Sequence, residues 1–140
     1  MFIKQLSIFV ENKPGRLHSI MDALSENGVD ISALSIADTT DFGILRIIVS
    51  DIDKAREVLR EIGVISKVTN VIAVYIDHKI GGLAAVLDHI SDAGIGIEYM
   101  YAFLGRTEGK ALMVLKADDE EMAAEVLSAN GVKLASMEEI

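Results

Sequence analysis

The feature that most restricts the fold of this 140-residue chain is an internal repeat. A shift of 66 positions aligns Asn12-Lys13-Pro14-Gly15-Arg16-Leu17 with His78-Lys79-Ile80-Gly81-Gly82-Leu83 and keeps Gly28 over Gly94. Beyond the second predicted hairpin the shift becomes 68, and Glu57-Val58-Leu59 then aligns with Glu125-Val126-Leu127. Repeats of a fixed length indicate one structural unit used more than once. We therefore expect two similar domains, residues 1–68 and residues 69–140.

Both copies show the same order of periodic segments. Leu6, Ile8 and Val10 alternate with other residues, which predicts a strand with one better-buried face. Apolar residues then recur three and four positions apart, which predicts an amphipathic helix. The inward positions of this helix are Leu17, Ile20, Met21 and Leu24 in the first copy and Leu83, Val86, Leu87 and Ile90 in the second. Strands are expected next over 31–37 and 44–49, and over 97–103 and 110–116, with hairpin turns at 38–41 and 105–109.

A second helix and a last strand complete each copy. The acidic residues Asp51 and Asp53, and those at 118–121, favour helix starts, because they complement the positive end of the helix dipole. The inward residues of the first of these helices are predicted to be Ala55, Val58, Leu59 and Ile62, and the glycines that end the four helices are Gly28, Gly63, Gly94 and Gly131. Last strands are expected over 64–68 and 132–136. The chain is thus predicted to be an α+β protein of two ferredoxin-like βαββαβ units, with antiparallel four-stranded sheets packed side by side or face to face.

Composition removes several classes of function. The net charge of −9 disfavours nucleic acid as a partner, and the absence of cysteine removes thiolate nucleophiles and the common zinc sites. No apolar run approaches the roughly 18 residues of a membrane span, so we expect a cytoplasmic protein without a membrane partner. The three histidines, His18, His78 and His89, have no metal-ligand spacing, and no catalytic motif is present. We expect neither a metal, nor a cofactor, nor catalysis.

The segment between the first strand and the first helix is the best candidate for a binding site. Pro14 fixes the backbone ahead of the helix, and Gly15 has no side chain to block the unpaired N–H groups of the first turn. Such N–H groups favour a carboxylate, beside which Asn12 offers further hydrogen bonds. Asp30, after the helix, has the charge to neutralise an ammonium group. Together these residues suit a free amino acid, although a Pro-Gly helix start required only for packing explains the same residues.

The Asn-Lys-Pro-Gly-Arg-Leu stretch, the helix ending in Glu-Asn-Gly-Val-Asp-Ile and the elements that complete each half resemble the ACT domain, a regulatory amino-acid-binding module. The resemblance implies ligands held between two ACT units, by the Pro-Gly loop of one and a strand of the other. In serine-binding members the positions of Asn12 and Asp30 contact the ligand, and Asp30 is an acid where those members have an amide. The second copy departs further, with His78, Ile80, Gly82 and Gly96 at the positions of Asn12, Pro14, Arg16 and Asp30. The resulting candidate ligand-binding residues are Asn12, Pro14, Gly15, Arg16, Leu17, Asp30 and Ile31 in the first copy and His78, Gly81, Gly82, Leu83, Gly96 and Ile97 in the second.

These observations favour a non-catalytic sensor that binds a small amino acid between ACT units. Occupancy would act on the protein's own assembly, expected to be a homodimer, or on an enzyme of amino-acid or aromatic-acid metabolism, as the resemblance implies. The alternatives are an assembly module without a small-molecule ligand and, on the same topology, an acylphosphatase-like hydrolase. The hydrolase lacks a convincing arginine-and-amide loop after the first strand.

Overall fold

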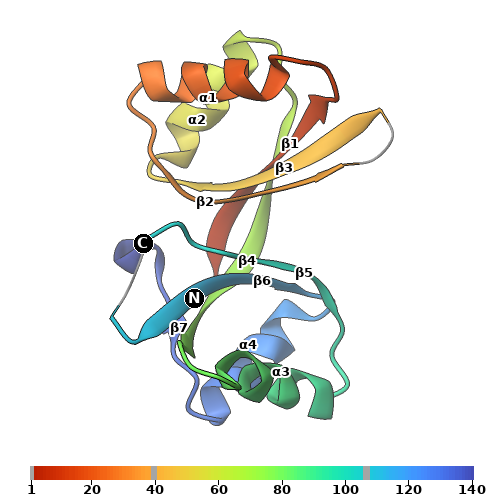
Figure 1. The fold of residues 1–140 in the computed structure, drawn as a ribbon, viewed down its shortest axis with the longest axis vertical. Coiled ribbons are helices and arrows are strands. Elements are labelled where there is room, and N and C mark those ends of the chain that lie inside the picture. Colours follow the sequence, from red (N-terminus) through yellow and green to blue (C-terminus); the bar gives the residue numbers. More distant parts are fainter. Residues whose placement is uncertain (1, 39–40, 106–107) are drawn as a thin grey trace. The chain divides into compact units, whose positions relative to one another are not determined.

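The structure, a computed structural model, describes residues 2–38, 41–105 and 108–140 (Figure 1). Contacts divide the described chain into two compact units. The first unit is Lys4–Thr69, and the second is Asn70–Ile140 together with Phe2 and Ile3. The predicted hairpin turns at 38–41 and 105–109 lie partly outside the described residues.

The first unit follows the predicted order of elements. It consists of β1 (Ile3–Glu11), α1 (Arg16–Glu26), β2 (Ile31–Asp38), β3 (Phe42–Val49), α2 (Ile52–Glu61) and the start of β4 (Ser66–Asp77). The strand order is β2-β3-β1-β4, and antiparallel pairing places Ile8 opposite Leu45 in β1 and β3. Both helices lie on one face of these strands (Figure 1). The α+β ferredoxin-like prediction is therefore confirmed for this unit.

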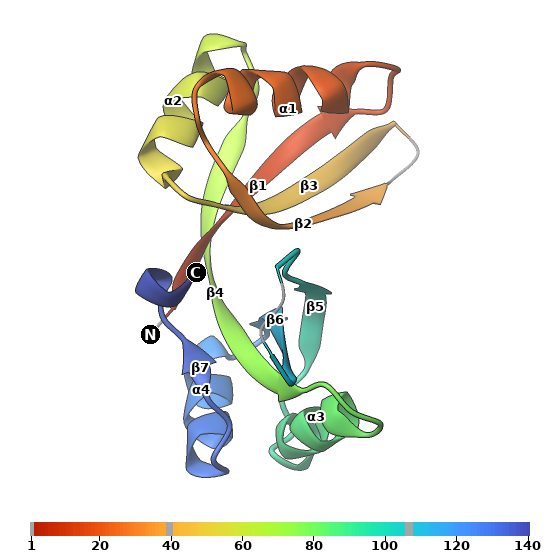
Figure 2. The ribbon, with the colours of Figure 1, turned by 60° about the vertical axis from the view of Figure 1, so that its left-hand side comes forward.

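The second unit repeats this arrangement with a reduced last strand. Its elements are the remainder of β4, α3 (Gly82–Asp92), β5 (Ile97–Ala102), β6 (Lys110–Ala117), α4 (Glu120–Ala129), β7 (Leu134–Ala135) and a 3₁₀ turn, η1 (Met137–Glu139). The strand order β7-β4-β6-β5 matches that of the first unit (Figure 2). The strand predicted over 132–136 is only two residues long, because the chain turns into η1 directly after Ala135.

Each unit has its own apolar core between helices and strands. Leu6, Ile8 and Val10 of β1 are buried against α1 and α2, as their alternation predicted. Ile72, Val74 and Ile76 of β4 occupy the same place in the second unit, where Phe2 also packs on the core. None of the helices in the described part of the chain has the length and apolar character that crossing a bilayer requires.

Two predicted inward residues are wrong. Ile62 is 45% exposed because α2 ends at Glu61, so Ile62 lies in the turn before β4 rather than on the helix's packed face. Leu83 is 41% exposed, in the first turn of α3. The predicted glycine helix ends are confirmed: Gly28, Gly63, Gly94 and Gly131 all have φ between +71° and +77°.

Candidate ligand-binding site

The amino ends of the four helices are of two kinds. At α2 and α4 an aspartate caps the helix, since Asp51 accepts a hydrogen bond from the Lys54 N–H and Asp119 accepts one from the Met122 N–H, both at 3.1 Å. At α1 and α3 a glycine occupies the cap position and no side chain caps the helix. Among the described residues, no acceptor pairs with the first-turn N–H groups of Leu17 and His18 in α1. These N–H groups are left to solvent or to a ligand.

The cap glycines have a conformation that side chains disfavour. Gly15 has φ +84° and Gly81 has φ +83°, in the left-handed region. A Cβ placed on either would meet nothing within 4 Å, so the space in front of each is open. Of these two properties of Gly15, the sequence predicted the open space in front of it but not the positive φ. The positive φ is a separate reason for glycine here, because other residues lose about 1 kcal/mol or more in this region.

The predicted first-copy residues separate into two groups at opposite ends of α1. Asn12, Pro14 and Gly15 are exposed before the helix and Arg16 is exposed as its first residue, whereas Asp30 follows the helix. The 11 residues of α1 rise by about 16 Å, so an amino acid cannot contact both ends within one unit. Leu17 and Ile31 are partly buried and pack on the core.

Asp30 has its own surroundings at the start of β2. Its backbone exchanges hydrogen bonds with Ser50: the Asp30 N–H donates to Ser50 Oγ at 3.0 Å and the Ser50 N–H donates to the Asp30 carbonyl at 2.9 Å. Its carboxylate forms no hydrogen bond or ion pair with the described residues. A shallow pocket of about 410 Å³ is lined by Asp30, Ile31 and the end of α1. Asp30 is thus available to a ligand that approaches this end of the unit.

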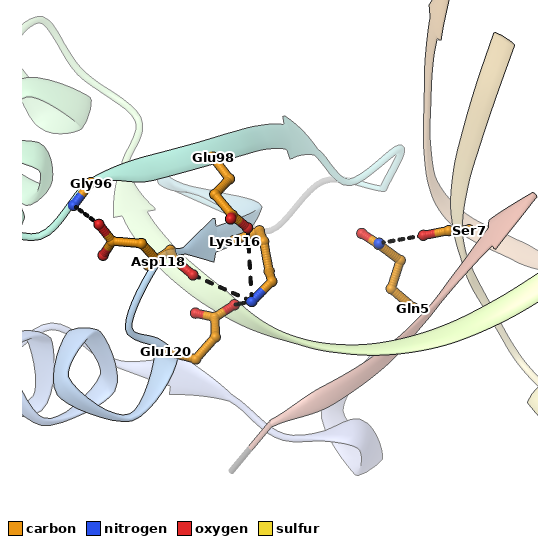
Figure 3. Close-up of polar contacts among 8 residues, drawn as sticks. Gln5, Ser7, Gly96, Glu98, Lys116, Asp118 and Glu120 are labelled. Atoms are coloured by element: carbon orange, nitrogen blue, oxygen red, sulfur yellow. Dashed lines mark hydrogen bonds and ion pairs between the residues drawn. The ribbon is translucent and has the colours of Figure 1, made fainter.

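The second copy uses the corresponding positions for internal packing. A Cβ on Gly82 would lie 2.0 Å from the Asp77 carbonyl oxygen, so the glycine lets α3 begin close against β4. The Gly96 N–H donates to Asp118 Oδ2 at 3.1 Å (Figure 3), and a Cβ on Gly96 would meet the same oxygen at 2.8 Å. Packing therefore explains Gly82 and Gly96 without a ligand.

The remaining second-copy residues are accessible. His78 is exposed and lines a pocket of about 360 Å³ with the ends of β5 and β6. Leu83 and Ile97 are exposed large apolar side chains, and Gly81 is exposed at the cap of α3. His78 and Gly81 thus have the same positions in the second unit as Asn12 and Gly15 in the first.

Each unit also has a pocket, called its notch below, that was not predicted from the sequence. The first-unit notch, about 310 Å³, is lined by Phe9, Glu11, Arg16, Phe42, Ile62 and Ile65, among others. It lies where the end of β1, the first turn of α1 and the turn between α2 and β4 meet. The second-unit notch, about 540 Å³, has Tyr75, Asp77, Gly82 and Lys133 at the positions of Phe9, Glu11, Arg16 and Ile65. The repeat alignment pairs these residues, but no periodicity in the sequence shows that they surround one space.

The charges around the two notches differ. In the first, a hydrogen bond from Lys13 lowers the pKa of Glu11, and Arg16 adds to this effect. In the second, Lys110 pairs with Asp77 and lowers the pKa of that carboxyl. The Tyr75 hydroxyl donates to Glu139 Oε2 at 2.9 Å, and burial together with this carboxylate raises the pKa of Tyr75. Glu139 also lies 3.7 Å from the Lys133 ammonium, so η1 engages two residues of the second-unit notch.

A family model for the ACT domain pair matches residues 1–140, the full length of the sequence. This chain belongs to the ACT domain pair family. The predicted family resemblance is thereby confirmed, and it agrees with the two βαββαβ units. A search of curated proteins found no match.

Several solved structures are similar to this chain. Protein BT0572 from Bacteroides thetaiotaomicron is 39% identical, with a TM-score of 0.91 over 98% of this chain and 94% of that one. The ligand-free regulatory subunit of aspartate kinase from Thermus thermophilus has a TM-score of 0.65 at 16% identity, over 90% of each chain. The regulatory subunit of aspartate kinase from Thermus flavus has a TM-score of 0.60 at 18% identity, also over 90% of each chain. The last two similarities concern the fold.

Proposed function

We propose that this ACT domain pair is a non-catalytic sensor of a free amino acid. The observation that carries the proposal is the contrast between capped and uncapped helices: α2 and α4 carry aspartate caps, whereas α1 presents unpaired N–H groups behind the open glycine Gly15. An amino-acid carboxylate supplies the acceptor that these N–H groups lack. The structurally similar aspartate kinase chains are regulatory subunits, which supports a regulatory rather than a catalytic role.

The separation of Asn12 and Asp30 determines how such a ligand is held. Because the two residues lie at opposite ends of α1, a ligand that touches both needs the loop of one unit and β2 of another. We infer that the other unit belongs to a second copy of the chain, which makes occupancy and dimerisation linked equilibria. The ligand then shifts assembly only by its differential affinity for the two states.

A thermal-shift panel of the common amino acids tests for the ligand. We expect one or a few amino acids to raise the melting temperature, because ligand at ten times its Kd stabilises the native state by about 1.4 kcal/mol. Gly15→Ala should abolish this shift, since the added methyl group projects into the open space before α1. Gly131→Ala is the matched control: Gly131 has φ +77° and equally open surroundings, but lies in the turn after α4.

Both glycine variants are expected to lose about 1 kcal/mol of stability, because both place alanine at a positive φ. Only Gly15→Ala should lose the ligand response. Equal ligand responses in the two variants would contradict the assignment of the loop, and a flat panel for the unmodified protein would contradict the sensor proposal.

A mixing experiment tests the shared site. Asn12→Ala and Asp30→Ala should each abolish ligand binding. A 1:1 mixture of the two, after subunit exchange, should regain about a quarter of the wild-type binding capacity, because half the dimers are mixed and each mixed dimer holds one intact site. Titration calorimetry measures this capacity. A mixture that stays inactive although subunits exchange would contradict a site shared between copies.

An assembly module is the second candidate function. It is favoured by β2, which lies at the outer end of the first unit's strand order and carries Ile36 with 49% exposure. Exposed edge strands pair readily with other strands. A concentration-dependent dimer in sedimentation, together with a flat amino-acid panel, would favour this function over the sensor.

A further inference from the structure

The first-unit notch exposes an unusual amount of apolar surface. Phe9, Phe42, Ile62 and Ile65 are 56%, 50%, 45% and 73% exposed, and all four line the notch. They are four of the five exposed large apolar side chains among the described residues of that unit; Ile36 is the fifth. Apolar side chains gathered in a hollow indicate an apolar ligand or partner group.

Two opposite charges stand at the edge of these apolar side chains. A hydrogen bond from Lys13 and the nearby charge of Arg16 lower the pKa of Glu11, whose carboxylate lies 3.1 Å from the Lys13 ammonium. The Arg16 guanidinium forms no ion pair or hydrogen bond with any described residue. A carboxylate and a guanidinium at one hollow complement the ammonium and carboxylate of a zwitterion.

The position of Arg16 is unfavourable for the helix itself. It is the first residue of α1, where the helix dipole disfavours a positive charge, and this first turn contains no acidic residue. By contrast, α2 and α4 have acidic first turns. A charged residue that opposes the local rule, and that no ion pair or hydrogen bond with a described residue holds in place, is more often placed for function than for folding.

The second-unit notch is lined at corresponding positions by residues without these properties. Lys133 replaces Ile65 and is engaged by Glu139, as is Tyr75 at the position of Phe9. Gly82 replaces Arg16 and cannot be an arginine, since even a Cβ would overlap the Asp77 carbonyl. The notch is thus a product of the βαββαβ unit, and only the first copy is lined for an apolar zwitterion.

We propose that the first-unit notch binds the side chain of a hydrophobic amino acid, whose carboxylate pairs with Arg16 and whose ammonium faces Glu11. This inference rests on the proposed amino-acid sensing and names the class of the ligand. The volume of about 310 Å³ suits one leucine- or phenylalanine-sized molecule, being at the small end of ligand pockets. The β1–α1 loop then supplies its N–H groups beside the same carboxylate.

Titration calorimetry on the full chain tests the ligand class. L-leucine and L-phenylalanine should bind at least about tenfold more tightly than L-serine and L-aspartate, because the latter two bury little apolar surface. Removing the carboxylate from the ligand, as in 3-methylbutylamine, should weaken binding by about tenfold or more. In Arg16→Gln, the advantage of L-leucine over 3-methylbutylamine should shrink by about tenfold, because only the loop N–H groups then contact the carboxylate. Arg56→Gln, at an exposed arginine on α2, should leave this advantage unchanged.

Variants of the apolar wall separate this inference from the sensor proposal. Ile65→Asn should reduce the preference for L-leucine over L-serine by about fivefold, and Leu104→Asn, at a residue 62% exposed elsewhere, should leave it unchanged. Tight binding of L-serine or L-aspartate that Ile65→Asn does not affect would overturn the hydrophobic ligand and leave the sensor standing. No binding of any amino acid at about 10 mM would overturn both.

Discussion

Gly82→Ala is expected to destabilise the second unit by about 3 kcal/mol, the largest effect of any substitution considered for this chain. The added Cβ would lie 2.0 Å from the Asp77 carbonyl oxygen and 3.0 Å from its carbon, both of which are backbone atoms of β4. Backbone held in a strand cannot move aside as a side chain does, so α3 must shift from its place on the sheet. Thermal unfolding should show a melting temperature lower by about 10 °C.

Gly81→Ala provides the control for this prediction. It lies one residue earlier, has φ +83° and meets nothing within 4 Å, so its cost is backbone strain alone, about 1 kcal/mol. Stability losses of equal size in the two variants would mean that α3 does not begin as close to β4 as described.

Glu120→Gln is expected to stabilise the protein by about 2 kcal/mol at pH 8 and to have no effect near pH 4. Glu120 is in the first turn of α4, its side chain is 11% exposed, and its carboxyl lies near the Lys116 ammonium (Figure 3). Burial raises the pKa of Glu120 from 4.5 to about 7. A backbone hydrogen bond with Ala117 and the Lys116 ammonium, 3.9 Å away, oppose the rise, while the Glu98 carboxylate adds to it.

The sign of the pH dependence follows from the raised pKa. Below pH 4.5 the carboxyl is neutral in both the folded and the unfolded chain, so it takes nothing from stability. Between pH 4.5 and about 7 the unfolded chain ionises first, and the folded state loses stability as the pH rises. Denaturant unfolding at several pH values should show this loss in the unmodified protein and not in Glu120→Gln. Glu121→Gln, at an exposed neighbour in the same turn, should lose stability over this pH range as the unmodified protein does. If Glu121→Gln did not lose stability with rising pH, the pH dependence could not be assigned to Glu120.

Periodicity and turn chemistry predicted most of the fold, because each signal is local. The alternation of Leu6, Ile8 and Val10 and the glycine helix ends required no knowledge of distant residues, and both are confirmed. Errors arose at ends of elements. Ile62 continues the helical spacing of α2, but the helix ends one residue earlier. The last strand is shorter than predicted and is followed by η1, in which Glu139 accepts a hydrogen bond from the Tyr75 hydroxyl.

The candidate site was less predictable, because its geometry depends on which residues of one unit, distant in the sequence, lie close together in space. Asn12 and Asp30 carry suitable groups, but only the straight helix between them shows that one unit cannot bring both to one small ligand. Gly81 has open space in front of it, whereas Gly82 lies against the Asp77 carbonyl. The sequence Gly-Gly does not distinguish these two roles. The notch was missed for the same reason, since Phe9, Arg16 and Ile65 share no spacing in the sequence.

The second unit draws Phe2 and Ile3 from one end of the sequence and β7 from the other. During synthesis on the ribosome, the first unit can therefore fold as soon as Thr69 has emerged. The second must wait until residues 134–135 appear, and until then Phe2 and Ile3 lack their final neighbours. During this interval Phe2 and Ile3 are accessible to chaperones, and a fragment that begins at residue 69 would be a poor substitute for the intact second unit.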